Sequence, residues 1–180
     1  MKSPRAVARR AVYRLLADPE KGWNAVMEVE AEQYGIAPLP LQFNGQGKNV
    51  DLAHWQVDDV PVSRLTGSLR LALSAIESQD QRTNGSQARR FQNFCGLVRV
   101  VLLFLYWQSA DDGDALIERA EFAADAIEGT AYTILASPSA GWPPNITFSD
   151  IATSAEEVRI AGDHYYKPIT IDIVLQVDIT

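Results

Sequence analysis

Cysteine and histidine are scarce in this chain of 180 residues, which has one cysteine, Cys95, and two histidines, His54 and His164. A single cysteine cannot close an internal disulfide, so a disulfide scaffold and a cysteine-rich zinc site are excluded. Because Cys95 lies in an apolar stretch, we expect an inert thiol in the core. We expect no metal ion and no other cofactor.

Hydrophobic runs long enough to cross a membrane are also missing. The longest run, Phe94 to Trp107, is shorter than the roughly 20 residues that a bilayer requires, and Arg99 interrupts it. The N-terminus has basic residues but no continuous apolar segment and no small-residue cleavage site, which argues against a secretory signal. We therefore expect a protein made in a cytoplasm, with no membrane partner.

Motifs of the large enzyme classes do not occur, including the glycine-rich phosphate loop, the nucleophile elbow, the paired-histidine zinc motif and the kinase set. The nearest phosphate-loop candidate, Gly45 to Lys48, lacks the preceding strand and the following Ser or Thr. The acids between Asp111 and Asp114 lack the glutamate of a calcium loop, so we interpret them as charges at a helix N-terminus. The sequence thus predicts a protein that is not an enzyme.

The composition is that of a folded protein, with 47% hydrophobic and 22% charged residues in a length that suits one domain. The charge is uneven. The whole chain carries −7, but its first seventeen residues hold five basic residues and no acid, so the remainder carries −12. An acidic body repels phosphates, and we expect no sequence-specific nucleic-acid partner. The basic start, with Arg5, Arg9 and Arg10, is either a solvated helix face or a surface that docks onto an acidic neighbour, including another copy.

Hydrophobic periodicity predicts two helices near the N-terminus. The first covers Pro4 to Leu16, and the second runs from Asn24 to a C-terminal cap at Gly35. The stretch from Ile36 to Gln56 contains prolines and glycines and is expected to be a loop or irregular edge structure. Residues 1–60 are therefore expected to form an N-terminal helical and irregular extension.

Residues 61–180 show the alternation typical of a sheet and one strong helical period. We expect an α+β sandwich domain here, with an antiparallel or mixed sheet and one main helix packed across it. Clear strands are predicted at Leu69–Ala75, Phe94–Trp107 and Ile169–Ile179, and a helix is predicted at Ala115–Leu135. The segment Ile146–Ile160 is predicted to be weaker β or irregular structure. The strand from Phe94 is apolar on both faces, and the main helix covers only one. Its second face therefore needs the N-terminal helices or a neighbouring subunit.

A polar stretch, Glu77 to Arg90, links the first two strands and contains the turn signal Asn84-Gly85. It is either a floppy loop or a long hairpin arm that extends past the body of the domain. As an arm it would expose Arg82, Arg89 and Arg90 for contacts with other proteins.

Two further positions are candidate sites. Trp142 stands between Gly141 and two prolines, and an aromatic side chain in so stiff a turn loses little entropy on binding. We expect Trp142 to be an exposed interface anchor. His164 follows Asp163 at an expected turn before a strand that starts at Pro168. No nucleophile stands at a spacing that would connect it with this pair. A histidine that is hydrogen-bonded at a turn is therefore favoured over a catalytic one.

The order of these elements, with the middle strand opened by Phe94-Cys95-Gly96-Leu97-Val98, resembles the tail terminator, or tail completion, proteins of tailed bacteriophages over about residues 60 to 180. The resemblance implies a non-catalytic virion subunit, made in the host cytoplasm. Such a subunit forms a ring, a hexamer, between the tail tube and the head-side connector or stopper protein. The arm between Ser78 and Asn93 would match the long inter-strand loop of the family, whereas the second N-terminal helix departs from its compact members.

Other interpretations remain open from the sequence. The chain is alternatively another neck or tail component, such as a head-closure or tube protein. It is otherwise a cytosolic α+β module that binds a small ligand or a peptide, or an enzyme with a site around Asp163 and His164.

Overall fold

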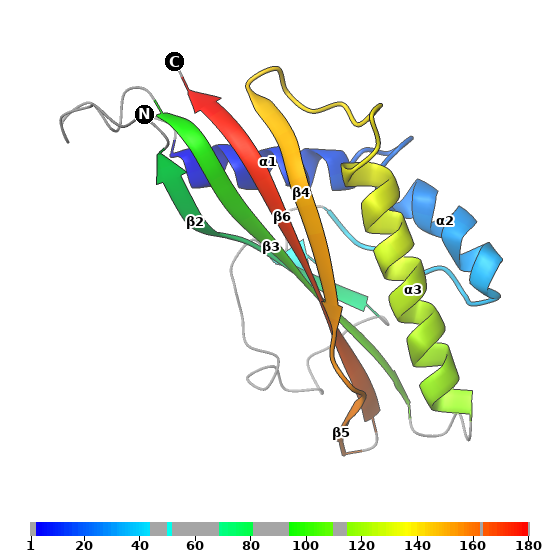
Figure 1. Cartoon of the computed structure of the whole chain (residues 1–180). Helices are drawn as coiled ribbons and strands as arrows, with labels where there is room; N and C mark the ends of the chain where they lie inside the picture. The colour runs from blue at the N-terminus through cyan, green and yellow to red at the C-terminus, as the bar shows by residue number, and fades with distance from the viewer. Residues whose placement is uncertain are drawn as a thin grey trace.

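The computed structural model describes residues 3–43, 50–51, 69–80, 94–109, 115–162 and 164–179. Within them the chain has the expected α+β fold, with three helices and a six-stranded mixed sheet (Figure 1). The elements are α1 (Pro4–Leu16), α2 (Trp23–Tyr34), β1 (Val50–Asp51), β2 (Leu69–Asp80), β3 (Phe94–Ser109), α3 (Leu116–Leu135), β4 (Ile146–Ala155), β5 (Arg159–Ala161) and β6 (His164–Ile179).

The sheet is built around two long central strands, β3 and β6, of 16 residues each. They pair antiparallel along their whole length, from Phe94 opposite Ile179 to Ser109 opposite His164. The strand order is β1-β2-β3-β6-β4, and β5 pairs with β6 beyond the end of β4. Only the short β1 runs parallel to its neighbour, whereas the other described pairings are antiparallel.

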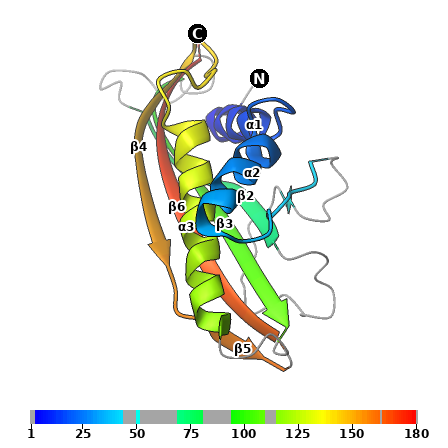
Figure 2. The ribbon, with the colours of Figure 1, turned by 90° about the vertical axis from the view of Figure 1, so that its right-hand side faces the viewer.

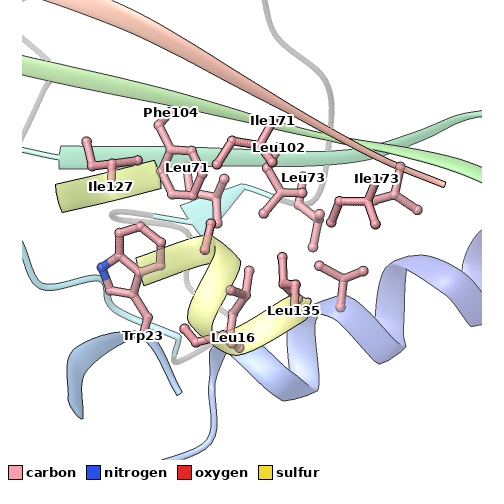
Figure 3. Packing of buried hydrophobic residues seen from close by; sticks show 14 of the residues in the cluster. Leu16, Trp23, Leu71, Leu73, Leu102, Phe104, Ile127, Leu135, Ile171 and Ile173 are labelled. Atoms are coloured by element: carbon pink, nitrogen blue, oxygen red, sulfur yellow. The ribbon is translucent and has the colours of Figure 1, made fainter. Parts of the chain in front are cut away.

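All three helices lie on one face of the sheet (Figures 1 and 2). Leu16 of α1, Trp23 of α2 and Leu135 of α3 belong to the same buried cluster as inward-facing residues of the strands, which Figure 3 shows at close range. The N-terminal helices therefore share one hydrophobic core with the sheet. They cover the same face as α3, so the expectation that they cover the second face of β3 is wrong.

The second face of β3 is nevertheless buried in the single chain. Its side chains Val101, Leu103, Leu105 and Trp107 are between 2% and 9% exposed. The expectation that this apolar face needs another copy to hide it is therefore wrong. Towards the start of β3 the same face becomes polar, where Arg99 is paired with Asp172 of β6.

Strand β2 continues five residues beyond Ala75, the end that the sequence predicts. A register shift between Ala75 and Glu77 leaves Ile76 as an extra residue, and pairing with β3 then continues to Asp80. Such a bulge re-aims the side chains that follow it. Residues 76–79 are exposed, so β2 reaches the surface here, whereas its partner β3 stays in the sheet with Phe94 and Val98 buried.

Strand β6 begins at His164, five residues before the predicted start, and Pro168 lies inside it. Proline has no N–H to donate, so it is tolerated only where a strand has no partner for that group. The carbonyl of Pro168 accepts a hydrogen bond of 3.0 Å from the N–H of Glu156, in the break between β4 and β5. The position that lacks an N–H donor therefore faces this interruption. The segment Ile146–Ile160, expected to be weaker β or irregular structure, forms the two ordered strands β4 and β5.

Candidate functional site

A pocket of about 630 Å³ lies where α2, the end of β3 and the start of α3 meet. The chain reaches it from α2 through Gly35, whose φ of 65° and hydrogen bonds with the last turn end the helix. Glycine is favoured there because it adopts this left-handed conformation without steric cost. The N–H of Ile36 donates to the carbonyl of Ala31 and turns the following segment back along the pocket wall.

Aromatic side chains from three separate elements line this pocket. Tyr34 and Phe122 bring their ring centroids to 6.5 Å, and Tyr106 contributes from β3. Polar groups stand beside them, since the Tyr106 hydroxyl donates to Oε1 of Gln108 at 2.9 Å. Glu118 and Arg119 add one charge of each sign. The pocket has the size and the mixed lining of small-molecule sites, which are apolar with a few polar groups that fix orientation.

The helical layer carries its charges in two separate groups. Helix α1 has four arginines and no acid, with Arg5, Arg10 and Arg14 exposed and Arg9 partly buried. Helices α2 and α3 together have seven acids and one basic residue. Exposed members of the acidic group include Glu28, Glu32, Glu118, Glu121 and Asp125.

The described residues of the candidate cluster around His164 divide between the two faces of β6. His164 lies in a strand and not at a turn, opposite Ser109 on one side and Ala161 on the other. Alternation along β6 places Tyr165 and Lys167 on the helix-covered face and His164 on the other. Asp163 lies outside the described residues.

A buried ion pair, which the sequence interpretation missed, joins the sheet to α3. Nζ of Lys167 lies 2.7 Å from Oε1 of Glu121, and the lysine is only 3% exposed. Lys167 is an even number of residues away from the apolar positions of β6, and this spacing is the signal that places it on the core face. Its partner depends on which helix turn lies above it.

A second ion pair lies on the opposite face of the sheet. Nε of Arg99 donates to Oδ1 of Asp172 at 2.9 Å. This hydrogen bond, followed by the charge of Asp172 and that of Glu77, raises the pKa of Arg99. The pair is partly exposed, so it positions two neighbouring strands and contributes little to stability.

Trp142 is not the exposed anchor that the sequence predicts. Its ring is part-buried and stacks on Phe148 at 6.4 Å, and its indole N–H donates to the carbonyl of Leu135 at 3.1 Å. The side chain thus closes the end of α3 because the stiff turn follows this helix directly.

Cys95 is partly buried and not a core residue. It lies near the start of β3, where its sulfur accepts a hydrogen bond of 3.9 Å from Nε2 of Gln176. Arg82, Arg89 and Arg90, and the acids expected to start α3, lie outside the described residues.

In the described part of the chain, no group of three acidic, histidine or cysteine side chains is arranged to hold a metal ion. None of the helices described is long and apolar enough to span a bilayer. A comparison of the whole sequence with family models and with curated proteins finds no match.

Proposed function

We propose that this protein is a non-catalytic structural subunit of a phage virion, of the tail terminator or tail completion type. Its copies form a ring, a hexamer, between the tail tube and the head-side connector or stopper protein. The proposal starts from the resemblance of residues 60–180 to that family.

The β2–β3 hairpin is the observation that carries the proposal. Its strands stay paired from Leu69 opposite Tyr106 to Asp80 opposite Gly96. The half beyond Ile76 is exposed on β2 and leads into the polar stretch that matches the long inter-strand loop of the family. On β3 the same half stays within the sheet, since Phe94 and Val98 are 6% and 0% exposed and pair with β6. The exposed residues 76–79 of β2 are therefore the part of the hairpin that is open to a neighbouring subunit.

The experiment is to identify the genes that flank this one and to co-produce the chain with the tail-tube protein encoded there. Negative-stain electron microscopy is expected to show rings of sixfold symmetry on one end of each tube. Removal of residues 81–93, with a short glycine linker in their place, is expected to abolish the capping while the circular dichroism spectrum is kept. Uncapped tubes with the intact protein, or flanking genes of unrelated metabolism, contradict the proposal.

A second candidate function, a small-ligand or peptide-binding module, is favoured by the pocket between α2 and α3. Its volume of about 630 Å³ lies within the range of ligand sites, about 300–1,000 Å³. Screening a fragment library by NMR tests this function. Shifts confined to Tyr34, Tyr106 and Phe122, and lost on Phe122→Ala, favour the binding module over the ring subunit.

A further inference from the structure

We infer that the basic face of α1 binds the acidic face of α3 on a second copy of this chain. The inference rests on the proposed ring function, and it names the surfaces that join neighbouring subunits. Helices α1 and α3 both belong to the layer on one side of the sheet (Figure 2).

The basic face is defined by Arg10 and Arg14. Both are exposed, and they are four residues apart, which places them side by side on the helix. Arg5, which is also exposed, lies nine residues before Arg14 and therefore on the opposite side of the helix. Helix α1 contains no acid to neutralise them.

The acidic face is defined by Glu118 and Asp125 on α3, both exposed. Glu121, which pairs with Lys167, lies on the same side of α3. Helices α2 and α3 pack against each other, and the Tyr34–Phe122 contact holds them together at one end.

Exposed apolar side chains accompany these acids. Ile117 and Phe122 on α3 are 65% and 36% exposed. Large apolar side chains among charged ones are typical of interfaces, where the apolar groups supply affinity and the charges supply orientation.

Charge also decides how two copies meet. Like faces repel each other, so a symmetric contact of α1 with α1, or of the acidic face with itself, is disfavoured. The attractive contact joins unlike faces of two copies, and such head-to-tail contacts close into rings when the rotation between subunits allows it. The acidic body that repels nucleic acid is in this arrangement the receptor for the basic helix of the neighbour.

Charge reversal with complementary mixing tests the inference. The variants are Arg10→Glu/Arg14→Glu and Glu118→Lys/Asp125→Lys. The control Glu20→Lys/Glu157→Lys, on exposed loop residues, has the same charge change as the second variant and the opposite change to the first. Self-association is measured by sedimentation velocity over a range of concentrations, and circular dichroism checks that each variant is folded.

We expect each test variant alone to associate more weakly with itself, with a dissociation constant at least about tenfold higher than that of the unchanged protein. The equimolar mixture of the two test variants, and the chain with all four substitutions, are expected to associate again, whereas the control variant behaves as the unchanged protein. About 1 M salt, where the Debye length is about 3 Å, is expected to weaken the association of the unchanged protein.

Three results overturn the inference. They are an unchanged protein that stays monomeric at low salt, test variants that associate as well as the unchanged protein, and a mixture that does not regain association. The second and third results leave the ring function standing with another interface. Failure of the ring function itself appears in the tail-tube experiment, as uncapped tubes with the unchanged protein.

Discussion

Nζ of Lys167 in β6 lies 2.7 Å from Oε1 of Glu121 in α3, and the two side chains differ sharply in exposure, 4% against 55%. The lysine is surrounded by the core, whereas the glutamate reaches over it from the solvent side. Among the described residues, Glu121 is the carboxylate that compensates the charge of this ammonium group.

We predict that Glu121→Gln lowers the free energy of unfolding by about 1–3 kcal/mol, because it leaves a buried charge without its counter-charge. Lys167→Met is expected to change stability by less, about 1 kcal/mol in either direction, because an apolar side chain suits the site. Urea denaturation measures both. Asp125→Asn, one turn further along α3, is the control and should change stability by less than about 0.5 kcal/mol. An equal loss for Glu121→Gln and this control contradicts the prediction.

Trp23 holds α2, β3 and the segment after α2 together. Its ring stacks on Phe104 at a centroid distance of 4.8 Å, and its indole N–H donates to the carbonyl of Leu39 at 2.8 Å. We expect Trp23→Ala to destabilise the protein by about 3–5 kcal/mol, because it opens a cavity in the core. Trp23→Phe keeps the stacking and loses the hydrogen bond, so its effect should be smaller. Thermal and urea unfolding measure the stability of the two variants. A larger loss of stability for Trp23→Phe than for Trp23→Ala refutes this account.

Gly129 and Gly22 are expected to respond to alanine with opposite signs. A Cβ at Gly129 meets Oε2 of Glu30 at 2.9 Å, the movable end of a flexible side chain. Gly129→Ala should therefore stabilise α3 by up to about 1 kcal/mol through its helix propensity. A Cβ at Gly22 meets backbone carbonyls of Leu16 and Asp18 at 2.5 and 2.4 Å, so Gly22→Ala should cost about 1–3 kcal/mol. Unfolding curves decide the matter, and a stabilised Gly22→Ala variant would be the contrary result.

Asp18, in the turn between α1 and α2, is expected to make the stability of the protein depend on pH. Hydrogen bonds from the backbone N–H groups of Lys21 and Glu20, each 2.9 Å to Oδ1, lower the pKa of its carboxyl group. Because this pKa is lower in the folded chain, Asp18 contributes stability above its unfolded pKa, and the contribution is lost as the pH falls through the folded value. NMR titration should place the midpoint below the ordinary range of aspartate. Asp18→Asn should make stability less dependent on pH in the acid limb, and a midpoint at or above the ordinary value argues against the hydrogen bonds.

The sequence predicted the helices well because their apolar residues recur with a period that depends on local geometry alone. Helix α1 has the predicted bounds, and α2 ends before Gly35 as expected. The strand pattern likewise located β2, β3 and β6. Their ends were missed, because the bulge at Ile76 and the tolerance of Pro168 depend on neighbouring strands.

The pocket and the buried ion pair were out of reach of sequence patterns. Tyr34, Tyr106 and Phe122 come from segments far apart in the chain, and only the packing of α2 against α3 brings them together. Trp142 was misjudged for a related reason. The stiffness of its turn was visible in the sequence, but the free carbonyl of Leu135 that receives its N–H was not.

The interruption between β4 and β5 at Pro168 has a consequence for the outer edge of the sheet. An uninterrupted outer strand offers a row of free N–H and C=O groups, which is a template for aggregation with other chains. Here β4 has a bulge between Phe148 and Asp150, and the edge breaks before β5 begins at Arg159. This edge is therefore a poor template for the addition of a strand from another chain.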